Sequence, residues 1–209
     1  MSLKFIGISQ RLLQNESYYE LREALSLEWG EFFAKNLEGF LPLPLSYAIN
    51  IECYQEVLAG VILSGGNDLN ALNPNPLSQK RDLYETKIIE LCQRTHKPLL
   101  GVCRGAQMLS EYFGSQLKLG AGHVGEHFIK TAQNEIYKVN SFHNYCIVKL
   151  GEELVAQSYA EDKSVESFFH KTLPFFGIMW HIEREGGIEN QEIFKKWIEA
   201  IKNFKEKCK

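Results

Sequence analysis

Residues 101–105, with the sequence GVCRG, are the part of the chain best suited to covalent chemistry. The apolar run 98–102 predicts a buried strand that leads into this segment, and residues 105–113 predict a helix that leaves it. A sharp turn between a strand and a helix lifts a nucleophile to the top of a sheet, and the flanking glycines let the two backbones approach closely. The helix N-terminus also favours a thiolate. We therefore interpret Cys103 as a nucleophile, the alternative being a small buried cysteine.

A histidine and a glutamate two positions apart, His181 and Glu183, follow a second apolar segment at 175–180. A cysteine nucleophile needs a base and a group that orients that base. Side chains at i and i+2 leave a strand on the same face, so the Glu183 carboxylate can hold the tautomer of the His181 ring. Without Cys103, the simpler interpretation would be a surface histidine and a solvated carboxylate at a strand end.

A double glycine, Gly65 and Gly66, ends the apolar strand predicted at 60–63. Paired glycines let backbone N–H groups point into a site, as an oxyanion hole requires. The backbone N–H of Arg104, directly after the nucleophile, is the natural second donor. Taken alone, the double glycine would more simply be an ordinary turn.

The elements that must position these groups alternate between strands and helices in the first half of the chain. Strand–helix–strand order is typical of a doubly wound parallel sheet. No repeat or long linker interrupts this order, so residues 1–209 are predicted to form a single domain. Apolar and helical periodicity predicts the remaining segments, which are extended at 4–9, 40–42, 135–139, 145–149 and 165–169 and helical at 18–37, 78–95 and 191–207.

Composition excludes several classes of protein. The chain has 209 residues, of which 44% are hydrophobic and 23% charged, as is ordinary for a globular protein. The longest unbroken apolar stretch, residues 175–180, is far shorter than the ~20 residues of a membrane span. No signal-peptide pattern is visible at the start of the chain. The formal charge of −3 argues against nucleic acids or acidic membranes as partners.

The cysteines are five in number and widely spaced, with no C-x-x-C pair and no zinc-like cluster with the histidines. An odd count without a secretion signal favours reduced thiols in the cytosol. We therefore expect a cytoplasmic protein without a metal. The cysteines expected to be structural or incidental are Cys53, Cys92, Cys146 and Cys208.

Taken in order, the double glycine, the G-x-C-x-G segment and the final W-H-x-E resemble the class I glutamine amidotransferase superfamily. Ile182 stands where that family usually has proline, which changes backbone stiffness but leaves both chemical groups in place. The resemblance spans nearly the whole chain. It implies an α/β fold, a flavodoxin-like three-layer sandwich with a mixed, mainly parallel central sheet.

One branch of the superfamily, the γ-glutamyl-amine hydrolases of the peptidase C26 group, is most similar. Arg81, Asp82 and Glu85 match its R-D-x-x-E segment, and residues 139–143 match a second motif. Arg104 stands where amidotransferases that feed ammonia to a synthase more often carry leucine or isoleucine. In length and motifs the chain also resembles the capsule-biosynthesis hydrolases that act on γ-glutamyl-CDP-amidate.

The resemblance implies cysteine-dependent hydrolysis of a γ-glutamyl amide without a cofactor. Cys103 would form a γ-glutamyl thioester, Gly66 and Arg104 would hold the oxyanion, and His181 would act as acid and then as base. The expected partners are a small γ-glutamyl conjugate of an amine or phosphoramidate and water, and the expected state is a monomer or homodimer. The alternatives are a glutaminase subunit that delivers ammonia to a separate synthase, and a non-enzymatic binding module, which would carry a broken triad.

Further positions are candidates for contacts with the substrate. The resemblance places Gln107, Asn144 and Tyr145 near the glutamyl group. Arg81 either faces the leaving group or pairs within its own segment. His123 and His127 have the i, i+4 spacing that suits a metal on one helix face, but three nearby glycines argue against a helix, so a substrate loop or a structural polar loop is expected. The full set of candidates is Gly65, Asn67, Arg81, Gln107, His123, His127, Asn144 and Tyr145.

Overall fold

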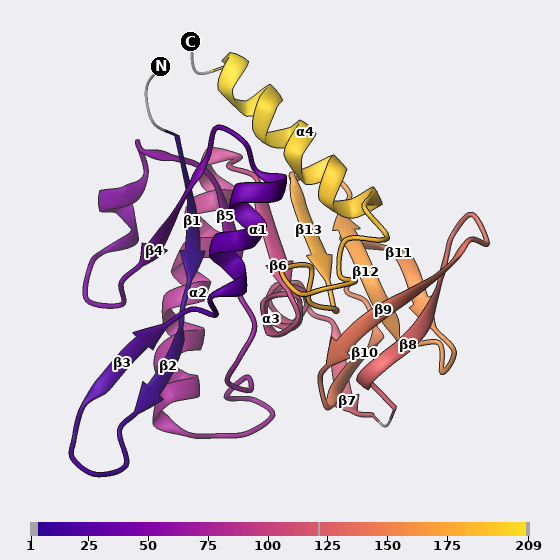
Figure 1. Ribbon diagram of the computed structural model, residues 1–209, viewed down its shortest axis with the longest axis horizontal. Coiled ribbons are helices and arrows are strands. Elements are labelled where there is room, and N and C mark those ends of the chain that lie inside the picture. The colour runs from indigo at the N-terminus through magenta and orange to yellow at the C-terminus, as the bar shows by residue number, and fades with distance from the viewer. Residues whose placement is uncertain (1–3, 121, 208–209) are drawn as a thin grey trace.

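Apolar segments pair side by side as parallel strands in the computed structural model, which describes residues 4–120 and 122–207 (Figure 1). Their order across the sheet is β4 (Leu41–Leu45), β1 (Phe5–Ser9), β5 (Leu58–Leu63), β6 (Leu99–Val102) and β13 (Phe175–Ile178). Every residue of β5, β6 and β13 is buried, as expected for strands that are covered on both faces.

Beyond β13 the same sheet continues with antiparallel strands, which lie to the right of β13 in Figure 1. In order they are β12 (Val165–His170), β11 (Leu154–Ala160), β8 (Val124–Thr131) and β9 (Ile136–Phe142), while β10 (Tyr145–Lys149) pairs with β12 and β7 (Gln116–Leu119) pairs with β10. The mixed sheet with a parallel centre confirms the predicted fold class.

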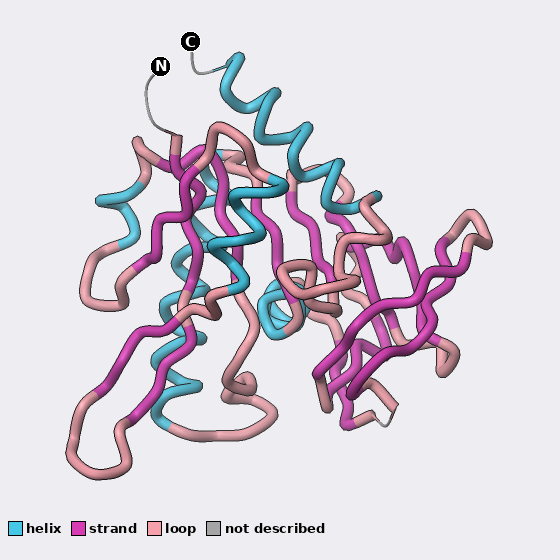
Figure 2. The backbone as a smooth tube through the Cα atoms, viewed as in Figure 1, coloured by secondary structure: helices cyan, strands magenta, loops and turns pink. Residues whose placement is uncertain are grey.

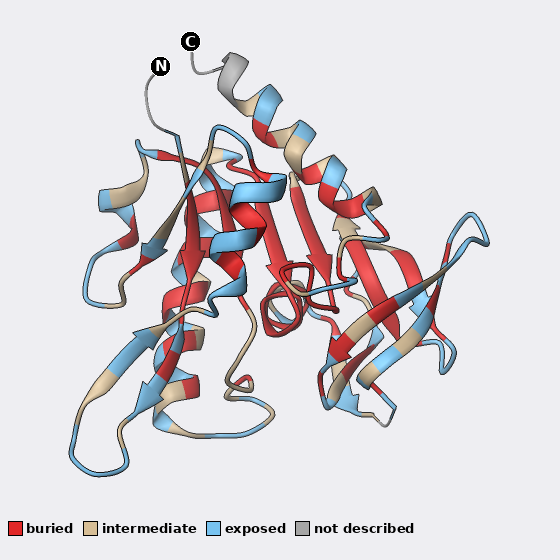
Figure 3. Ribbon diagram, in the orientation of Figure 1, coloured by how far each residue is buried: buried red, intermediate tan, exposed pale blue. Residues whose placement is uncertain are grey.

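Helices cover both faces of the parallel strands. Ile62 of β5 shares one apolar cluster with α1 and α4, whereas its neighbours Val61 and Leu63 share another with α2 and α3. Successive residues of a strand point to opposite faces, so β5 contributes to both clusters, which are buried in Figure 3. The result is the predicted three-layer sandwich. The helices are α1 (Glu28–Asn36), α2 (Pro76–Thr95), α3 (Arg104–Tyr112), α4 (Glu192–Lys207) and the short 3-10 helix η1 (Ile51–Tyr54).

The helix predicted at 18–37 is wrong in its first half. Those residues include β3 (Leu21–Ala24), which pairs antiparallel with β2 (Arg11–Gln14), and only α1 is helical. The Asn67 side chain accepts a hydrogen bond from the Leu12 N–H (2.9 Å) and donates one to the Leu12 carbonyl (3.0 Å). This contact holds β2 in an extended conformation, and the sequence around residues 11–14 does not reveal it. The hairpin projects away from the sheet in Figure 2.

Smaller differences concern the edges of the sheet. The extended segment predicted at 40–42 lies largely in β4, which continues to Leu45. Pro42 and Pro44 are tolerated because β4 is an edge strand, where a missing N–H group costs little. The strands β2, β7, β8 and β11 were not predicted. Cys208 lies outside the described residues. Within residues 4–120 and 122–207, none of the helices combines the length and apolar character needed to cross a membrane.

Candidate active site

Cys103 lies at the sharp turn between β6 and α3, where the sequence places it. Its backbone adopts a conformation that residues other than glycine rarely adopt (φ 53°, ψ −109°). A Cβ atom on Gly101 would lie 2.5 Å from the Gly105 carbonyl oxygen, and one on Gly105 would lie 2.0 Å from the Leu63 carbonyl oxygen. Only glycine fits at these two positions, so close packing of strand against helix explains the G-x-C-x-G segment.

His181 lies in the turn that follows β13, with its ring hydrogen-bonded to Glu183 and lining the same cleft as Cys103. Its Nδ1 atom is 2.7 Å from Glu183 Oε1, and the three side chains belong to residues that are only 5–8% exposed. The strand predicted to reach residue 180 ends at Ile178, so the pair meets in a turn rather than by strand alternation. Asn140 of β9 fixes this turn, because its Oδ1 accepts a hydrogen bond from the His181 N–H (3.0 Å).

The protonation of His181 follows from its two partners. Burial disfavours the charged ring and lowers its pKa, but the hydrogen bonds with Cys103 and Glu183 outweigh burial and raise the pKa of His181 to about 10. The ring therefore holds its proton at neutral pH. A protonated imidazole beside a thiol is the arrangement that stabilises a thiolate nucleophile.

Gly65 and Gly66 follow β5 and lie against the pair formed by Cys103 and His181. A Cβ atom on Gly65 would be 2.9 Å from His181 Cε1 and 3.7 Å from Cys103 Cβ, so a side chain there would crowd the site. Gly66 has a φ of +92°, which favours glycine. The backbone N–H of Arg104, in the first turn of α3, has no partner within the helix. An oxyanion hole formed by the N–H groups of Gly66 and Arg104 stays a prediction.

A cleft of about 240 Å³ opens beside these groups, at the carboxyl ends of β5 and β6. Ligands bind at this end of the strands in open parallel α/β sheets. Sequence reasoning missed two cations in its lining, Arg11 of β2 and Arg184. The place of Arg184 directly after Glu183 was an available signal, whereas Arg11 depends on the unpredicted hairpin. The cleft is lined by Arg11, Ala24, Leu25, Ser26, Trp29, Ser64, Gly65, Gly66, Cys103, Phe142, His181, Glu183 and Arg184.

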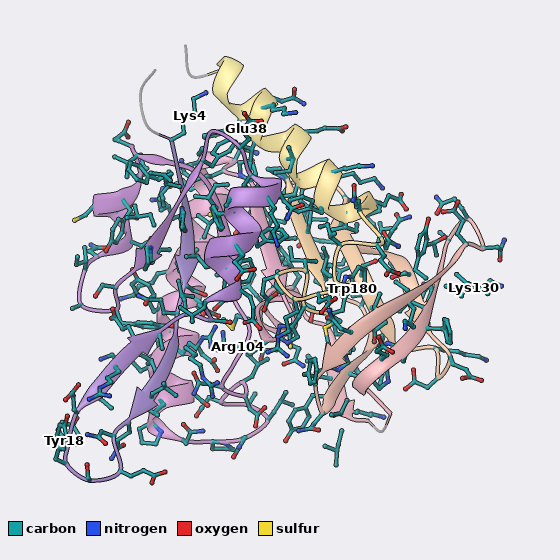
Figure 4. All side chains as sticks on the ribbon, viewed as in Figure 1. Lys4, Tyr18, Glu38, Arg104, Lys130 and Trp180 are labelled. Carbon is teal, nitrogen blue, oxygen red and sulfur yellow. The ribbon has the colours of Figure 1, made fainter. Side chains whose placement is uncertain are left out.

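Arg81 is fully buried and is not part of the cleft lining. Its guanidinium donates hydrogen bonds to Glu85 Oε1 (2.9 Å) and to the carbonyl oxygens of Ser64 (2.7 Å) and Gly65 (3.0 Å). The Arg104 side chain, near the centre of the molecule in Figure 4, pairs with the other oxygen of Glu85. The structure therefore favours the structural alternative for Arg81 and corrects its expected contact with a substrate. Arg81 thus holds the carbonyl groups of Ser64 and Gly65 in place at the double glycine.

Four other candidate contacts lie outside the cleft lining. The Asn67 side chain is occupied by the backbone of β2. Gln107 Nε2 donates a hydrogen bond to the Tyr145 carbonyl (2.9 Å), and the Tyr145 hydroxyl donates one to the Leu72 carbonyl (3.3 Å). Asn144 is exposed. Gln107 thus connects α3 to β10, and a contact between these residues and a glutamyl group stays a prediction.

His123 and His127 contact β12 and do not line the cleft. His123 Nδ1 is 3.1 Å from Glu166 Oε1, and His127 Nε2 is 3.5 Å from Glu166 Oε2. His123 is 4% exposed, because it lies inside the antiparallel part of the sheet. Their expected contact with a substrate is therefore not supported. His127 lies in β8 and His123 directly precedes it, so the segment is not helical, and both rings face Glu166 of β12.

Comparison with known proteins identifies the family. Residues 43–201 match the family described as glutamine amidotransferase class-I. The chain is 51% identical over 199 residues to the γ-glutamyl-CDP-amidate hydrolase of Campylobacter jejuni, a match that covers 95% of this chain and 99% of that protein. It is 29% identical over 161 residues to one chain of the glutamine-hydrolysing GMP synthase of Thermoplasma volcanium, covering 72% of this chain and 75% of that one.

Solved structures share the fold at lower sequence identity. A glutamine amidotransferase from Thermotoga maritima has a TM-score of 0.63 at 22% identity, and the match covers 98% of this chain and 84% of that one. A chain of the GMP synthase type from Thermoplasma acidophilum has a TM-score of 0.73 at 18% identity, covering 99% and 98%. The family match includes the double glycine, the cysteine turn and the histidine–glutamate pair. The chain therefore belongs to the class I glutamine amidotransferase family.

Proposed function

We propose that the protein hydrolyses γ-glutamyl amides with Cys103 as nucleophile, His181 as acid and base, and Glu183 as the group that orients His181. The observation that carries this proposal is that Cys103 and the hydrogen-bonded pair of His181 and Glu183 line the same cleft. The relative that is 51% identical is named for hydrolysis of γ-glutamyl-CDP-amidate, which supports a γ-glutamyl phosphoramidate as substrate. Water is the second substrate, and the reaction needs no cofactor.

The reaction proceeds in two halves. The Cys103 thiolate attacks the γ-carbonyl carbon, a carbon–sulfur bond forms, and the N–H groups of Gly66 and Arg104 hold the oxyanion. His181 gives its proton to the amide nitrogen as the carbon–nitrogen bond breaks, which releases the amine or amidate and leaves a γ-glutamyl thioester. His181 then takes a proton from water, the hydroxide attacks the thioester carbonyl, and glutamate leaves as the thiolate is restored.

The lining of the cleft favours an anionic leaving group. Its volume of about 240 Å³ lies below the ~300–1,000 Å³ of typical small-molecule sites, which fits the glutamyl half better than a whole nucleotide conjugate. The leaving group therefore extends out of the cleft. Arg11 is exposed and Arg184 is half-buried, so both guanidinium groups can meet a phosphate there. Gln107, Asn144 and Tyr145 are proposed near the glutamyl group on resemblance alone.

The test compares glutamate release from γ-glutamyl-CDP-amidate, neutral γ-glutamyl amides and free glutamine. We expect kcat/KM for the anionic conjugate to exceed that for glutamine by at least ~100-fold, because binding energy from the leaving group helps to align the scissile carbonyl. Equal efficiency on glutamine and on every conjugate would contradict the proposal. That result would favour a glutaminase that delivers ammonia to a separate synthase.

The proposal also covers the cellular location and the oligomeric state of the protein. Within the described residues Cys53, Cys92, Cys103 and Cys146 are free thiols, which supports a reducing cytoplasm. We propose one domain, a monomer or homodimer, and a place in capsule biosynthesis, the last because of the γ-glutamyl-CDP-amidate substrate. Size-exclusion chromatography with light scattering tests the oligomeric state.

A further inference from the structure

Three histidines and a glutamate form a buried cluster in the antiparallel part of the sheet. Glu166 of β12 is completely buried, and His127 of β8 faces it. His123 precedes β8, and His143 lies in the turn between β9 and β10. We call these four residues the histidine cluster. None of them lines the cleft beside Cys103, so the proposed mechanism gives the cluster no role.

The separations of the polar atoms suit a bound metal ion. His123 Nδ1 is 3.1 Å and His143 Nε2 is 3.6 Å from Glu166 Oε1, and His127 Nε2 is 3.5 Å from Glu166 Oε2. Ligands of a tetrahedral zinc ion lie about 3.3–3.6 Å apart, since zinc–nitrogen and zinc–oxygen distances are about 2.0–2.2 Å. Donor atoms of His123, His127 and Glu166 all lie within 4.8 Å of one another.

In two of these rings, the nitrogen that faces away from Glu166 already has a polar partner. His123 Nε2 is 3.0 Å from an Asp162 carboxylate oxygen, and His143 Nδ1 is 3.1 Å from the Tyr145 carbonyl oxygen. Asp162 is itself held by Ser164, whose N–H and hydroxyl donate to it at 2.9 and 2.6 Å. A histidine that binds a metal commonly donates its other N–H group to a carboxylate or a carbonyl in this way. These contacts orient the two rings so that His123 Nδ1 and His143 Nε2 face Glu166.

The inward-facing atoms of the histidine cluster lack hydrogen-bond partners. Among the described residues, both carboxylate oxygens of Glu166, both ring nitrogens of His127, His123 Nδ1 and His143 Nε2 are buried and make no hydrogen bond of good geometry, although His123 Nδ1 is 3.1 Å from Glu166 Oε1. A proton on His123 pairs that ring with Glu166, but His127 and His143 lie 3.5 and 3.6 Å from the same carboxylate, beyond the length of a good hydrogen bond. A cation bound by Glu166 would engage the ring nitrogens that face this carboxylate, and burial of unpaired polar atoms is otherwise costly.

We propose that the histidine cluster is a structural zinc site, with His123 Nδ1, His127 Nε2, His143 Nε2 and the Glu166 carboxylate as ligands. Imidazole nitrogen favours zinc over magnesium or calcium, which prefer oxygen ligands. Four protein ligands leave no open position, as is typical of structural rather than catalytic zinc. Cys146 lies within 4.8 Å of the donor atoms of His123 and His143, so a thiolate ligand is the competing arrangement.

Such an ion would support the strand that leads to the proposed catalytic base. It would tie β12 to β8 and to the turn between β9 and β10. The carbonyl oxygen of Glu166 accepts a hydrogen bond from the Met179 N–H (2.8 Å), two residues before His181. Zinc at Glu166 therefore restrains the end of β13, and its loss would first lower the stability of the antiparallel part of the sheet.

The first test measures metal directly. We expect about one zinc per purified chain by mass spectrometry of the metal content. After removal of metal with a chelator, Zn²⁺ at ~100 times its Kd should raise Tm by roughly 5–10 °C, whereas Mg²⁺ should not. Protein that contains no zinc and shows no rise in Tm with Zn²⁺ would overturn the proposal. These readouts do not depend on γ-glutamyl hydrolysis, so they remain informative if the proposed function fails.

Variants test the ligand set. His127→Ala and Glu166→Gln should each lose at least ~90% of the bound zinc. Because Glu166→Gln could fail to fold, the partly buried His127 is the deciding position. His96→Asn, a change at an exposed histidine outside the cluster with a φ of +52°, should retain all the zinc and controls for surface binding. Zinc retained by the His127 variant or lost from the His96 variant would overturn the site.

Cobalt substitution and a Cys146 variant distinguish the proposed ligands from the competing set that includes the Cys146 thiolate. Co²⁺ in place of zinc should give the visible absorption of a four-coordinate ion without a thiolate charge-transfer band. Cys146→Ser should bind zinc as tightly as the unmodified protein. A thiolate band, or zinc binding that is lost in the Cys146 variant, would overturn the proposed ligands.

Discussion

At the scale of single residues, the proposed chemistry depends on the sulfur of Cys103. Cys103→Ala should abolish turnover with little change in Tm, because a methyl group replaces a thiol in a small buried space. Cys103→Ser should be nearly inactive, since a hydroxyl does not ionise as a thiol does. Glutamate release and a thermal melt check both variants. Substantial turnover by the alanine variant would rule out a covalent thioester.

Labelling with iodoacetamide provides an independent check on Cys103. Cys103 lines the cleft beside the protonated His181, and Cys53 is exposed but is expected to be incidental. Cys92 is fully buried, and burial raises the pKa of its thiol to about 12. Mass spectrometry after brief treatment should find Cys103 modified before Cys53 and Cys92.

His181 and Glu183 make the rate depend on pH. His181→Asn should lower kcat by roughly 10²–10⁴-fold, the usual contribution of general acid–base catalysis. Glu183→Gln should cost less, because packing still orients the ring in part. The active form needs a protonated His181, whose pKa of about 10 depends on its hydrogen bonds with Cys103 and Glu183. Loss of the carboxylate lowers that pKa, so the alkaline limb of kcat/KM should move to lower pH.

A pH profile of the glutamine variant decides between two roles for Glu183. An alkaline limb that stays in place while kcat falls would mean that Glu183 acts through packing and not through the charge of the imidazole. The His181 variant should lack this limb altogether, which identifies the group that titrates.

Arg11 and Arg184 should determine the choice of leaving group. Each change to alanine should raise KM for the anionic conjugate by about 10-fold, because a charge-assisted hydrogen bond to phosphate is lost. Hydrolysis of glutamine should hardly change, since glutamine carries no anion at that end. Arg22→Ala is the matched control, because Arg22 is an exposed arginine of the same hairpin outside the cleft lining. An equal loss on both substrates would assign Arg11 or Arg184 a structural role.

At the scale of elements, a buried ionic network joins α2 and α3 to the end of β5. Glu85 accepts hydrogen bonds from Arg81 (2.9 Å) and from the Ser9 hydroxyl (2.7 Å), and it also pairs with Arg104. Glu85→Gln should destabilise the fold by about 3–5 kcal/mol, because buried guanidinium charge is left without its counter-charge. In a chain of this size the expected loss in Tm is roughly 6–20 °C.

An exposed ion pair provides the control for Glu85. Arg94 and Glu52 are 2.7 Å apart with side chains that are 59% and 47% exposed. Glu52→Gln should change stability by only about 0–1 kcal/mol, since water screens such pairs. Urea unfolding of both variants measures the difference. Similar losses at the two positions would mean that the network does not depend on buried charge.

The limits of prediction from sequence also appear at the scale of elements. The strand before Cys103 and the helix after it were predictable, because an apolar run, glycines and helical periodicity are local signals. The hairpin of β2 and β3 was not, because it depends on the contact of Asn67 with Leu12. The pairing of His181 with Glu183 was predicted, but from strand geometry. In the structure the two side chains meet in a turn and not on a strand.

The histidine cluster illustrates the same limit at longer range. The spacing of His123 and His127 was weighed on a helix, where glycines made a metal site improbable. In the structure His127 lies in β8 and His123 directly before it, so the segment is not helical. Glu166, which faces them, lies in β12 and comes from a distant part of the sequence. Pairings of this kind arise from sheet topology, which local periodicity does not contain.

At the scale of the whole molecule, the site joins the two parts of the sheet. The parallel part supplies Cys103 and the double glycine, whereas Asn140 of the antiparallel part holds the turn of His181. A shift between the two parts would move the His181 ring away from Cys103, on which the raised pKa of His181 depends. We therefore predict that the antiparallel strands support His181 in its proposed role as catalytic base, so that their stability affects turnover.

All the named groups of the candidate site lie in one chain, and this predicts that activity does not depend on a partner. Cys103, His181, Glu183 and the two cations of the cleft all belong to this chain, so we predict that the site needs no residue of another protomer. Turnover per chain with γ-glutamyl-CDP-amidate should stay constant over a ~100-fold dilution, because a site shared between protomers would be lost by mass action. A chain that delivers ammonia would behave in the opposite way, with weak hydrolysis of glutamine until a synthase binds. Activity that falls on dilution would place part of the site at a dimer interface, and activity that depends on an added synthase would contradict a hydrolase that works alone.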